Sequence, residues 1–172
     1  MAEQRVENGG GLHERKVMVA IDDSECSHYA LMWVLDNLEE SITKSPLVIF
    51  SAQLPPTNNS FTAAALSSAR MYCSVSATPE YTYTIQEQNR KLAFALLEKA
   101  KEICAGRGVD AEILTEVGDP QSTICDAVQR LNISLLVLGE RGSGKIKRAI
   151  QGSVSSYCLH NAKCPVLVVK KP

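Results

Sequence analysis

The sequence lacks any long hydrophobic run, and this excludes one broad class of protein. Its longest uninterrupted apolar stretch, Tyr29 to Leu35, has seven residues, whereas a membrane-spanning helix needs about 18 or more. Residues 1–15 are polar, with Asn8-Gly9-Gly10-Gly11 at their centre, and do not contain the apolar core of a secretory signal peptide. We therefore expect a protein without a membrane span, and we interpret residues 1–15 as a flexible N-terminal tail.

An excess of charge of one sign is also lacking. The 18 Lys and Arg residues nearly balance the 19 Asp and Glu residues, and the formal net charge is -1. Proteins that coat nucleic acids or anionic membranes need clustered cations, because their affinity comes largely from the release of counterions. We expect neither a nucleic acid nor a membrane as a partner, and the length of 172 residues favours a single domain.

Closely spaced cysteine pairs are missing, although the chain contains six cysteines. Without a C-x-x-C pair or a secretion signal, free thiols in a cytoplasmic or nuclear protein are favoured over a disulfide framework. Cys104 and Cys125 fall on the apolar stripes of predicted helices, where a free thiol packs as a small hydrophobic group. The Cys158-x-His160-x3-Cys164 pattern offers only three zinc ligands, so a zinc site is the weaker alternative.

Apolar runs rich in β-branched residues alternate with helical patterns along the chain. The runs are typical of strands buried in a parallel sheet, and the third, which alternates apolar and polar residues, is typical of an edge strand. We predict strands over Lys16–Ile21, Leu47–Gln53, Val109–Val117, Ile133–Leu138 and Val166–Val169. We predict helices over Glu25–Ile42, around Leu92–Cys104, from Pro120 to Asn132, and up to about His160.

Several residues mark where these helices begin and end. Ser24 and Asp119 are predicted N-caps, and Pro120 suits the first helical position because it needs no backbone donor. Gly106 and Gly108 supply the stop of the long helix. The stretch Leu54–Tyr83 fits no element, and a connection of this length is usually a lid, a binding loop or locally disordered.

This alternation predicts a doubly wound α/β fold in one domain, residues 16–170. Right-handed crossovers place helices on both faces of a five-stranded parallel sheet. The final strand, formed by Val166, Leu167, Val168 and Val169, lies at an edge of that sheet. Because an exposed apolar edge tends to pair with another chain, we expect a two-fold homodimer through this strand.

Two predicted strand ends carry residues suited to a ligand. Open α/β sheets bind ligands beyond the carboxyl ends of their strands, where the strand order reverses. Asp22-Asp23-Ser24 follows the first strand, and a glycine-bearing segment, residues 139–145, follows the fourth. That segment matches seven positions of the G-x-x-x-x-G-K-[ST] phosphate-binding pattern, but Ile146 replaces the hydroxyl residue that holds Mg²⁺, which disfavours a P-loop.

The spacing Gly139-x2-Gly142-x9-Gly152-Ser153 fits phosphate binding better. Glycines allow the backbone to approach a phosphate closely, and Gly152-Ser153 would offer donors at a helix N-terminus. Alternatively, one helix continues from Lys145, Gly152 is a packing glycine and Ser153 contacts no ligand.

The charged residues near these strand ends have two interpretations each. Lys145, Lys147 and Arg148 either face the phosphates or form a solvated helix face. Asp22 either binds Mg²⁺ beside the phosphates or is a turn residue at the end of the strand.

These motifs, with the opening Val-Met-Val-Ala-Ile-Asp-Asp-Ser and the closing Cys-Pro-Val-Leu-Val-Val, resemble the universal stress protein family. The similarity covers Lys16 to Lys170 and is greatest to the UspA-like, ATP-binding subgroup of plant type. It implies a Rossmann-like fold with strand order 3-2-1-4-5 that binds adenine nucleotides and is usually dimeric and cytosolic.

The resemblance also implies roles for individual residues around the nucleotide. It places Ala20 and Ile21 beside the adenine, the main chain of Ala52 at the adenine edge, and Asp22 near the ribose and phosphates. It also implies that the backbone of Gly139 and Gly142 contacts the ribose and phosphates. The triphosphate side is assigned to Gly152, Ser153, Val154 and Ser155, and Arg141 and Gly144 complete the nucleotide-binding candidates.

The resulting hypothesis is a stress-response protein that binds ATP or AMP, with Mg²⁺ as an additional ion at Asp22, and acts as a nucleotide-dependent switch or partner-binding module. We assign no catalytic residue, because His13, His28 and His160 have no evident Ser or Cys partner. One alternative is a slow ATPase or nucleotide hydrolase. Another is a dimeric interaction protein that binds no nucleotide and uses its glycines structurally.

Overall fold

Strands and helices alternate along the chain in the computed structural model, which describes residues 15–55, 79–140 and 154–172. The elements are β1 (Val17–Ala20), α1 (Glu25–Asn37), α2 (Glu39–Ile42), β2 (Leu47–Gln53), α3 (Pro79–Gly106), β3 (Ala111–Val117), α4 (Pro120–Arg130), β4 (Leu135–Gly139), α5 (Val154–Asn161) and β5 (Val166–Val169). The five strands form one parallel sheet in the order β3-β2-β1-β4-β5. The predicted fold class and strand order are confirmed, and β3 and β5 are the edge strands as expected.

The central strand of the sheet is β1, which pairs with β2 on one side and β4 on the other. Ala20 lies opposite Phe50 of β2 and Leu138 of β4, and all four residues of β1 are buried. Strands covered on both faces are apolar at every position rather than alternating. The chain order reverses at β1, because β2 and β3 lie to one side and β4 and β5 to the other.

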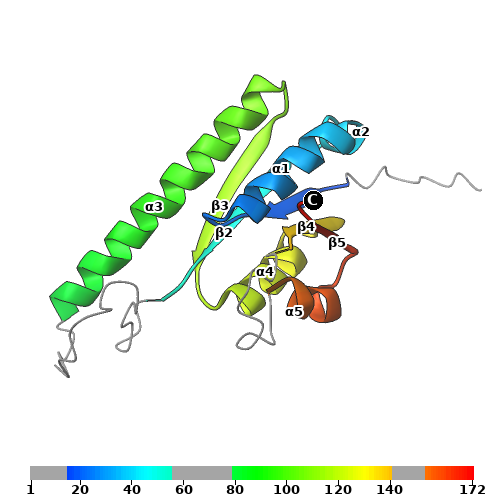
Figure 1. The fold of residues 1–172 in the computed structure, drawn as a ribbon. Coiled ribbons are helices and arrows are strands. Elements are labelled where there is room, and N and C mark those ends of the chain that lie inside the picture. Colours follow the sequence, from blue (N-terminus) through cyan, green and yellow to red (C-terminus); the bar gives the residue numbers. More distant parts are fainter. Residues whose placement is uncertain (1–14, 56–78, 141–153) are drawn as a thin grey trace, which may run out of the picture.

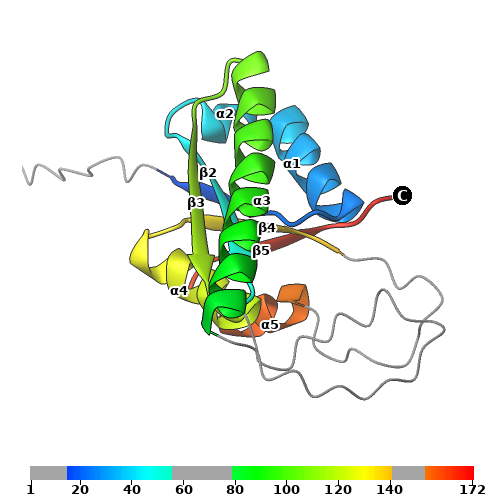
Figure 2. The same cartoon turned by 90° about the vertical axis from the view of Figure 1, so that its left-hand side faces the viewer.

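Helices cover both faces of the sheet (Figure 1), as predicted. Successive side chains of a strand point to opposite faces, so Val17 and Val19 belong to one hydrophobic cluster and Met18 and Ala20 to another. The first cluster is covered by α1 and α3, and the second by α4 and α5. Figure 2 shows the same layers from the side, with α3 crossing in front of the sheet.

The predicted helix caps are present. Ser24 Oγ accepts from the Ser27 backbone N–H at 3.3 Å, and Asp119 Oδ2 accepts from the Ser122 N–H at 3.2 Å. Pro120 occupies the first turn of α4. At the end of α3, Gly108 adopts φ +72°, a conformation that glycine reaches without the steric cost of a Cβ.

One predicted helix is two helices. We expected a single helix over Glu25–Ile42, but it is interrupted at Leu38, whose φ of -118° and ψ of 25° are not helical. The Leu38 carbonyl accepts from the N–H groups of Ser41 and Ile42 and so starts α2. The apolar spacing runs on across this break because Leu38 and Ile42 still pack against the same core, and spacing alone therefore gave no sign of it.

Two predicted strands begin two residues later than expected. Val109 donates its N–H to the Cys104 carbonyl and completes the turn that ends α3, so β3 starts at Ala111. Ile133 likewise donates to Val128, which leaves β4 to start at Leu135 and end at Gly139. Apolar residues that close a helix and apolar residues that open a strand look alike in the sequence, because both are buried.

The helix α3 starts within the stretch that resisted interpretation. It begins at Pro79 and has 28 residues, or about 42 Å at 1.5 Å per residue. Its amino-terminal end reaches well past α1 (Figure 1), and Tyr83 there is 69% exposed. Thr84 beside it is also exposed, so this part of α3 needs no apolar stripe, and the rest of the stretch, residues 56–78, lies outside the described residues.

Candidate functional site

The region above the end of β1, at the carboxyl edge of the sheet, is the candidate ligand crevice, because the strand order reverses there. The strand β1 ends at Ala20 opposite Phe50, whereas β2 continues for three more residues to Gln53, paired with β3. On the other side, β4 extends to Gly139, which pairs with Val169 of β5. The chain that leaves β1 thus passes between two longer strands at the point where the strand order reverses, the usual ligand position in open α/β sheets.

Asp22 orders the turn between β1 and α1. Its Oδ1 accepts from the Ser24 N–H at 3.0 Å and from the Ser24 hydroxyl. Aspartate commonly forms such turns by bonding to the backbone two residues further on, so the alternative interpretation of Asp22 as a turn residue is confirmed, and its predicted role toward Mg²⁺ and phosphates stays a prediction. Asp22 is also an exposed residue at the edge of the sheet.

Ser27, which our sequence analysis did not select, holds this turn from the helix side. Its Oγ accepts from the Asp22 N–H at 3.1 Å, and its hydroxyl lies 2.8 Å from the Asp22 carbonyl oxygen. Ser27 is buried in the first turn of α1. A serine on the buried face of a helix three residues after an N-cap was the available signal, because a buried hydroxyl needs a local partner.

Gly139 is required by packing. A Cβ at this position would lie 2.4 Å from the Cys26 carbonyl oxygen and 2.8 Å from the Ser27 nitrogen. The glycine therefore lets the end of β4 touch the backbone of the first turn of α1. Our prediction that Gly139 allows the backbone to approach a ligand is not tested by this contact, but the contact explains why a side chain is excluded.

Ion pairs connect the far side of the crevice to the C-terminal segment. The Glu140 N–H donates to the Val169 carbonyl at 2.8 Å, and its carboxylate lies 3.8 Å from Lys170 Nζ. Lys171 Nζ lies 2.6 Å from Glu25 Oε2, which lowers the pKa of the Glu25 carboxyl group and raises that of the Lys171 ammonium group. The negative charge of Glu140 beside the crevice is thus compensated by a lysine.

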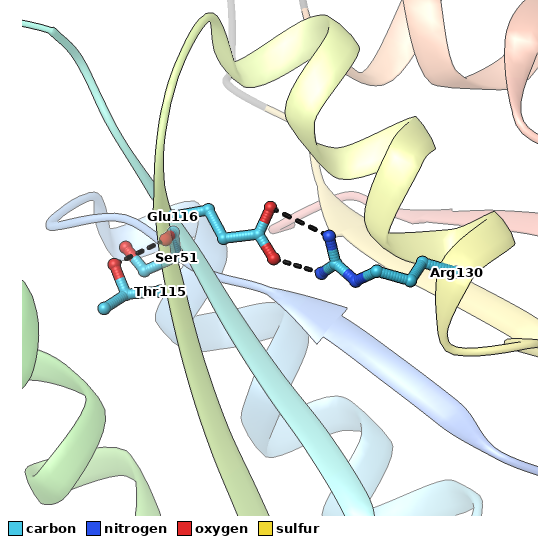
Figure 3. A network of polar contacts seen from close by, with 4 residues as sticks. All are labelled: Ser51, Thr115, Glu116 and Arg130. Carbon is cyan, nitrogen blue, oxygen red and sulfur yellow. Dashed lines mark hydrogen bonds and ion pairs between the residues drawn. The ribbon is translucent and has the colours of Figure 1, made fainter.

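Gln53, at the end of β2, carries a buried acceptor that our sequence analysis also missed. The Thr115 hydroxyl donates to the Ser51 carbonyl at 2.8 Å (Figure 3), so its oxygen accepts from Gln53 Nε2, also at 2.8 Å. These two hydrogen bonds fix the orientation of the Gln53 side-chain amide. Its Oε1 is then buried with no hydrogen-bond partner in the structure as described, an arrangement that costs about 1–3 kcal/mol and points to a missing donor.

The predicted site residues fall into three groups. Ala20 and Ala52 pack toward α4 and α5, and Ile21 packs toward α1 and α3. Val154 and Ser155 are the first residues of α5, and Ser155 is buried. Residues 141–153 fall outside the described residues, and with them the predicted residues Arg141, Gly142, Gly144, Lys145, Lys147, Arg148, Gly152 and Ser153.

A cavity of about 450 Å³ opens beside the end of β1 and runs between α1 and α3. Asp22 and Ser24 are among its polar lining residues, and Ile21, Met32 and Leu96 are among its apolar ones. Ligand pockets in proteins typically measure about 300–1,000 Å³. The structure thus brings two of the predicted residues, Ile21 and Asp22, to a recess large enough for a small molecule.

The described residues offer thiols but no metal centre. The cysteines at positions 26, 104, 125, 158 and 164 are all free. Among the residues that the structure describes, no three His, Cys, Asp or Glu side chains come together to hold a metal ion. The same part of the chain contains no helix that is both long and apolar enough to cross a bilayer.

The fold and the position of the Asp22 turn define a doubly wound α/β protein with a candidate ligand site at its topological switch point. A family model described as "Universal stress protein family" matches residues 14–170. The chain belongs to the universal stress protein family, as the resemblance of its motifs predicted.

Individual relatives match the sequence of this protein along nearly its whole length. The chain is 28% identical over 170 residues to a universal stress protein A-like protein of Arabidopsis thaliana, covering 94% of this chain and 93% of the relative. It is 30% identical over 156 residues to the universal stress protein YxiE of Bacillus subtilis, covering 90% and 98%. A solved universal stress protein of Arabidopsis thaliana with AMP bound is 25% identical, with a TM-score of 0.63 and 92% of each chain covered.

Proposed function

We propose that this protein binds an adenine nucleotide at the carboxyl edge of β1 and β4 and acts in the stress response as a nucleotide-dependent switch or partner-binding module. The observation that carries the proposal is the position of the Asp22–Ser24 turn, which lies at the switch point between β2 and β4. The Arabidopsis relative solved with AMP supports an adenine nucleotide as the ligand. In this proposal residues 16–170 are the binding domain and residues 1–15 are a tail.

In this proposal the phosphates bind to the glycine-containing stretch before α5, residues 139–153, and to the start of α5. Gly142, Gly152 and Ser153 would donate to phosphate oxygens, and Asp22 would share a Mg²⁺ ion with them, since Mg²⁺ takes one or two carboxylates together with phosphate oxygens. The exposed carboxylate of Asp22 at the edge of the sheet fits this chemistry. The Glu140 carboxylate, close to Lys170, does not oppose it with an uncompensated charge.

Isothermal titration with ATP and with AMP, each with and without Mg²⁺, tests the proposal. We expect saturable binding to one site per chain, weakened at least tenfold by Asp22→Asn. Asp36→Asn is the matched control, because Asp36 is an exposed carboxylate near the opposite end of α1, and it should leave the affinity unchanged. Absence of binding by either nucleotide would favour an interaction protein without a nucleotide, and phosphate release in a single turnover would favour the slow hydrolase.

The buried Oε1 of Gln53 would allow the site to select adenine over other bases. An adenine amino group would supply the donor that this oxygen lacks, whereas hypoxanthine presents a carbonyl in its place. Sites built to hydrogen-bond a donor discriminate strongly against an analogue without it. We expect AMP to bind at least tenfold more tightly than inosine monophosphate, and Gln53→Met to reduce this preference to less than threefold. A preference unchanged in Gln53→Met would remove Gln53 from the site.

The last strand supports a homodimer as the assembled state. β5 is an edge strand, and Val166, Leu167 and Val168 are only partly buried in a single chain. Pairing with a second copy would cover this apolar edge. Sedimentation velocity should give about twice the chain mass of 18.7 kDa, and a mass that stays at 18.7 kDa at all concentrations would contradict the dimer.

The free thiols suit a reducing compartment such as the cytoplasm.

A further inference from the structure

Two of the free thiols lie in contact on the face of the sheet opposite the cavity. Cys125 is in α4 and Cys158 is in α5, and their Sγ atoms are 3.8 Å apart. A disulfide bond has an S–S distance of about 2.05 Å, so the two sulfur atoms must move toward each other by less than about 2 Å to form one. Cys164, just before β5, packs partly buried against the same hydrophobic cluster.

The two thiols differ in exposure, which assigns an order to any reaction between them. Cys158 is 0% exposed, whereas Cys125 is partly exposed. A reagent from solution therefore meets Cys125 first, and Cys158 lies behind it in position to attack the Cys125 sulfur. This is the arrangement of an attacking and a resolving cysteine.

We propose that Cys125 and Cys158 are a reversible modification site, at which exchange with a low-molecular-weight disulfide such as oxidised glutathione forms an intramolecular disulfide between α4 and α5. This inference does not depend on nucleotide binding, because neither cysteine belongs to the crevice at the carboxyl edge of β1.

The exchange balances in two steps. The Cys125 thiolate attacks one sulfur of oxidised glutathione, breaks its S–S bond and releases one glutathione thiolate, which leaves a mixed disulfide on Cys125. The Cys158 thiolate then attacks the Cys125 sulfur and releases the second glutathione. The protein is oxidised by two electrons, oxidised glutathione is reduced to two glutathione molecules, and these take up the two protons lost by the cysteines.

The surroundings of the pair make the exchange slow. Burial raises the pKa of the Cys125 thiol, and it raises that of the Cys158 thiol to about 12. The contact with Cys158 offsets part of the rise in the Cys125 pKa, which Asp126 increases, and Cys125 followed by Cys164 adds to the rise at Cys158. Because only the thiolate attacks a disulfide, the pair follows a sustained change in redox conditions rather than a brief one.

Disulfide formation would fasten α5 to α4 across a separation of 33 residues. Closing such a loop restricts the unfolded chain and thereby stabilises the folded one. The link would hold the helix whose first residue, Val154, directly follows the predicted phosphate-binding pair Gly152-Ser153. The oxidised protein should unfold several degrees above the reduced protein.

The experiment equilibrates the full chain in glutathione buffers of increasing oxidised fraction, followed by alkylation and mass spectrometry. We expect a species that carries two fewer alkyl groups than the fully reduced chain, because a disulfide sulfur cannot be alkylated, and a cross-linked peptide that joins Cys125 to Cys158. A mixed disulfide that persists on Cys125 in the unsubstituted chain, or a cross-link from Cys125 to Cys164, would overturn the proposal.

Three variants test the order of events. Cys158→Ser should trap glutathione on Cys125, and Cys125→Ser should leave Cys158 reduced. Cys164→Ser is the matched control, because it removes the third thiol of the same cluster and should leave the Cys125–Cys158 link intact. If Cys158→Ser fails to fold by circular dichroism, Cys158→Ala takes its place, and an unmodified Cys125 in a folded variant would overturn the assignment.

Discussion

The two faces of the sheet share the same strands but carry different chemistry. On the face covered by α1 and α3, Cys104 is fully buried among aliphatic side chains, and the first turn of α1 touches the end of β4 at Gly139. On the face covered by α4 and α5, three cysteines share one cluster. The first face thus sets the shape of the carboxyl edge, and the second holds the thiols that exchange reactions can reach.

The largest effect should come from breaking the close contact on the α1 face. Gly139→Val places a side chain 2.4 Å from the Cys26 carbonyl oxygen, and neither backbone can move without disturbing α1 or β4. We expect a loss of unfolding free energy of about 3 kcal/mol, at the upper end for overpacked sites. Chemical denaturation measures it.

Gly106 at the end of α3 provides the matched control for this substitution. A Cβ there meets no atom within 4 Å, so Gly106→Ala should change the unfolding free energy by less than about 0.5 kcal/mol. Equal losses at positions 139 and 106 would show that the contact between β4 and α1 does not restrict the side chain.

The second-largest effect should be the loss of stability when the buried thiols of the two faces ionise in alkaline solution. Burial raises the pKa of Cys104 to about 11 and that of Cys158 to about 12. Because these values exceed those in the unfolded chain, the stability that each neutral thiol contributes is complete below about pH 9 and decreases as the pH rises. Between pH 9 and 11 we expect each thiol to reduce the unfolding free energy by about 1.4 kcal/mol per pH unit.

Denaturation curves between pH 8 and 10.5 measure this effect. Cys104→Ala and Cys158→Ala should each flatten the decrease, one on each face of the sheet. A slope that neither substitution changes would mean that these thiols titrate alike in the folded and unfolded chains.

The third effect compares the N-caps of α1 and α4. Ser24→Ala and Asp119→Ala should each reduce the unfolding free energy by about 1 kcal/mol. The larger loss is expected for Ser24, because its hydroxyl also bonds to Asp22, whereas Asp119 Oδ2 serves Ser122 N. Thermal denaturation measures both losses, and Ser24→Thr and Asp119→Asn, which keep a capping oxygen, should recover most of them.

The smallest effect concerns the exposed ion pairs on the two faces. Glu116 and Arg130 bond through two parallel contacts beside α4 (Figure 3), and Asp36 pairs with Arg107 at 2.6 Å beside α1 and α3. Glu116→Gln should cost up to about 1 kcal/mol and Asp36→Asn about 0.5 kcal/mol. Both costs should vanish in 1 M salt, since screening then acts within about 3 Å, and persistence at high salt would indicate another cause.

Most of the fold was predictable because its signals are local. Each buried strand is a short apolar run, and Ser24, Asp119 and Pro120 mark helix starts through bonds to residues within one turn. The break at Leu38 was not predictable, because the apolar spacing continues through it. The first turns of α3 were not predictable either, since a helix that overhangs the core needs no apolar stripe.

The candidate site was predictable only in part. Asp22 was evident as an acidic residue at the end of a buried strand. Ser27 and Gln53 were missed because each acquires its significance from partners brought near by folding, and Thr115 lies 62 residues from Gln53. The contact between Cys125 and Cys158 likewise joins residues on two helices.

The alternation of strands and helices and, through the glycine spacing, the family follow from local signals, because periodicity, capping and turn chemistry act between neighbours in the chain. Tertiary structure alone decided that Gly139 must lack a side chain to admit α1, that the Gln53 oxygen is left without a donor, and that two thiols lie 3.8 Å apart. Those features depend on which surfaces pack together, and packing brings into contact atoms whose distance along the chain carries no information about their distance in space.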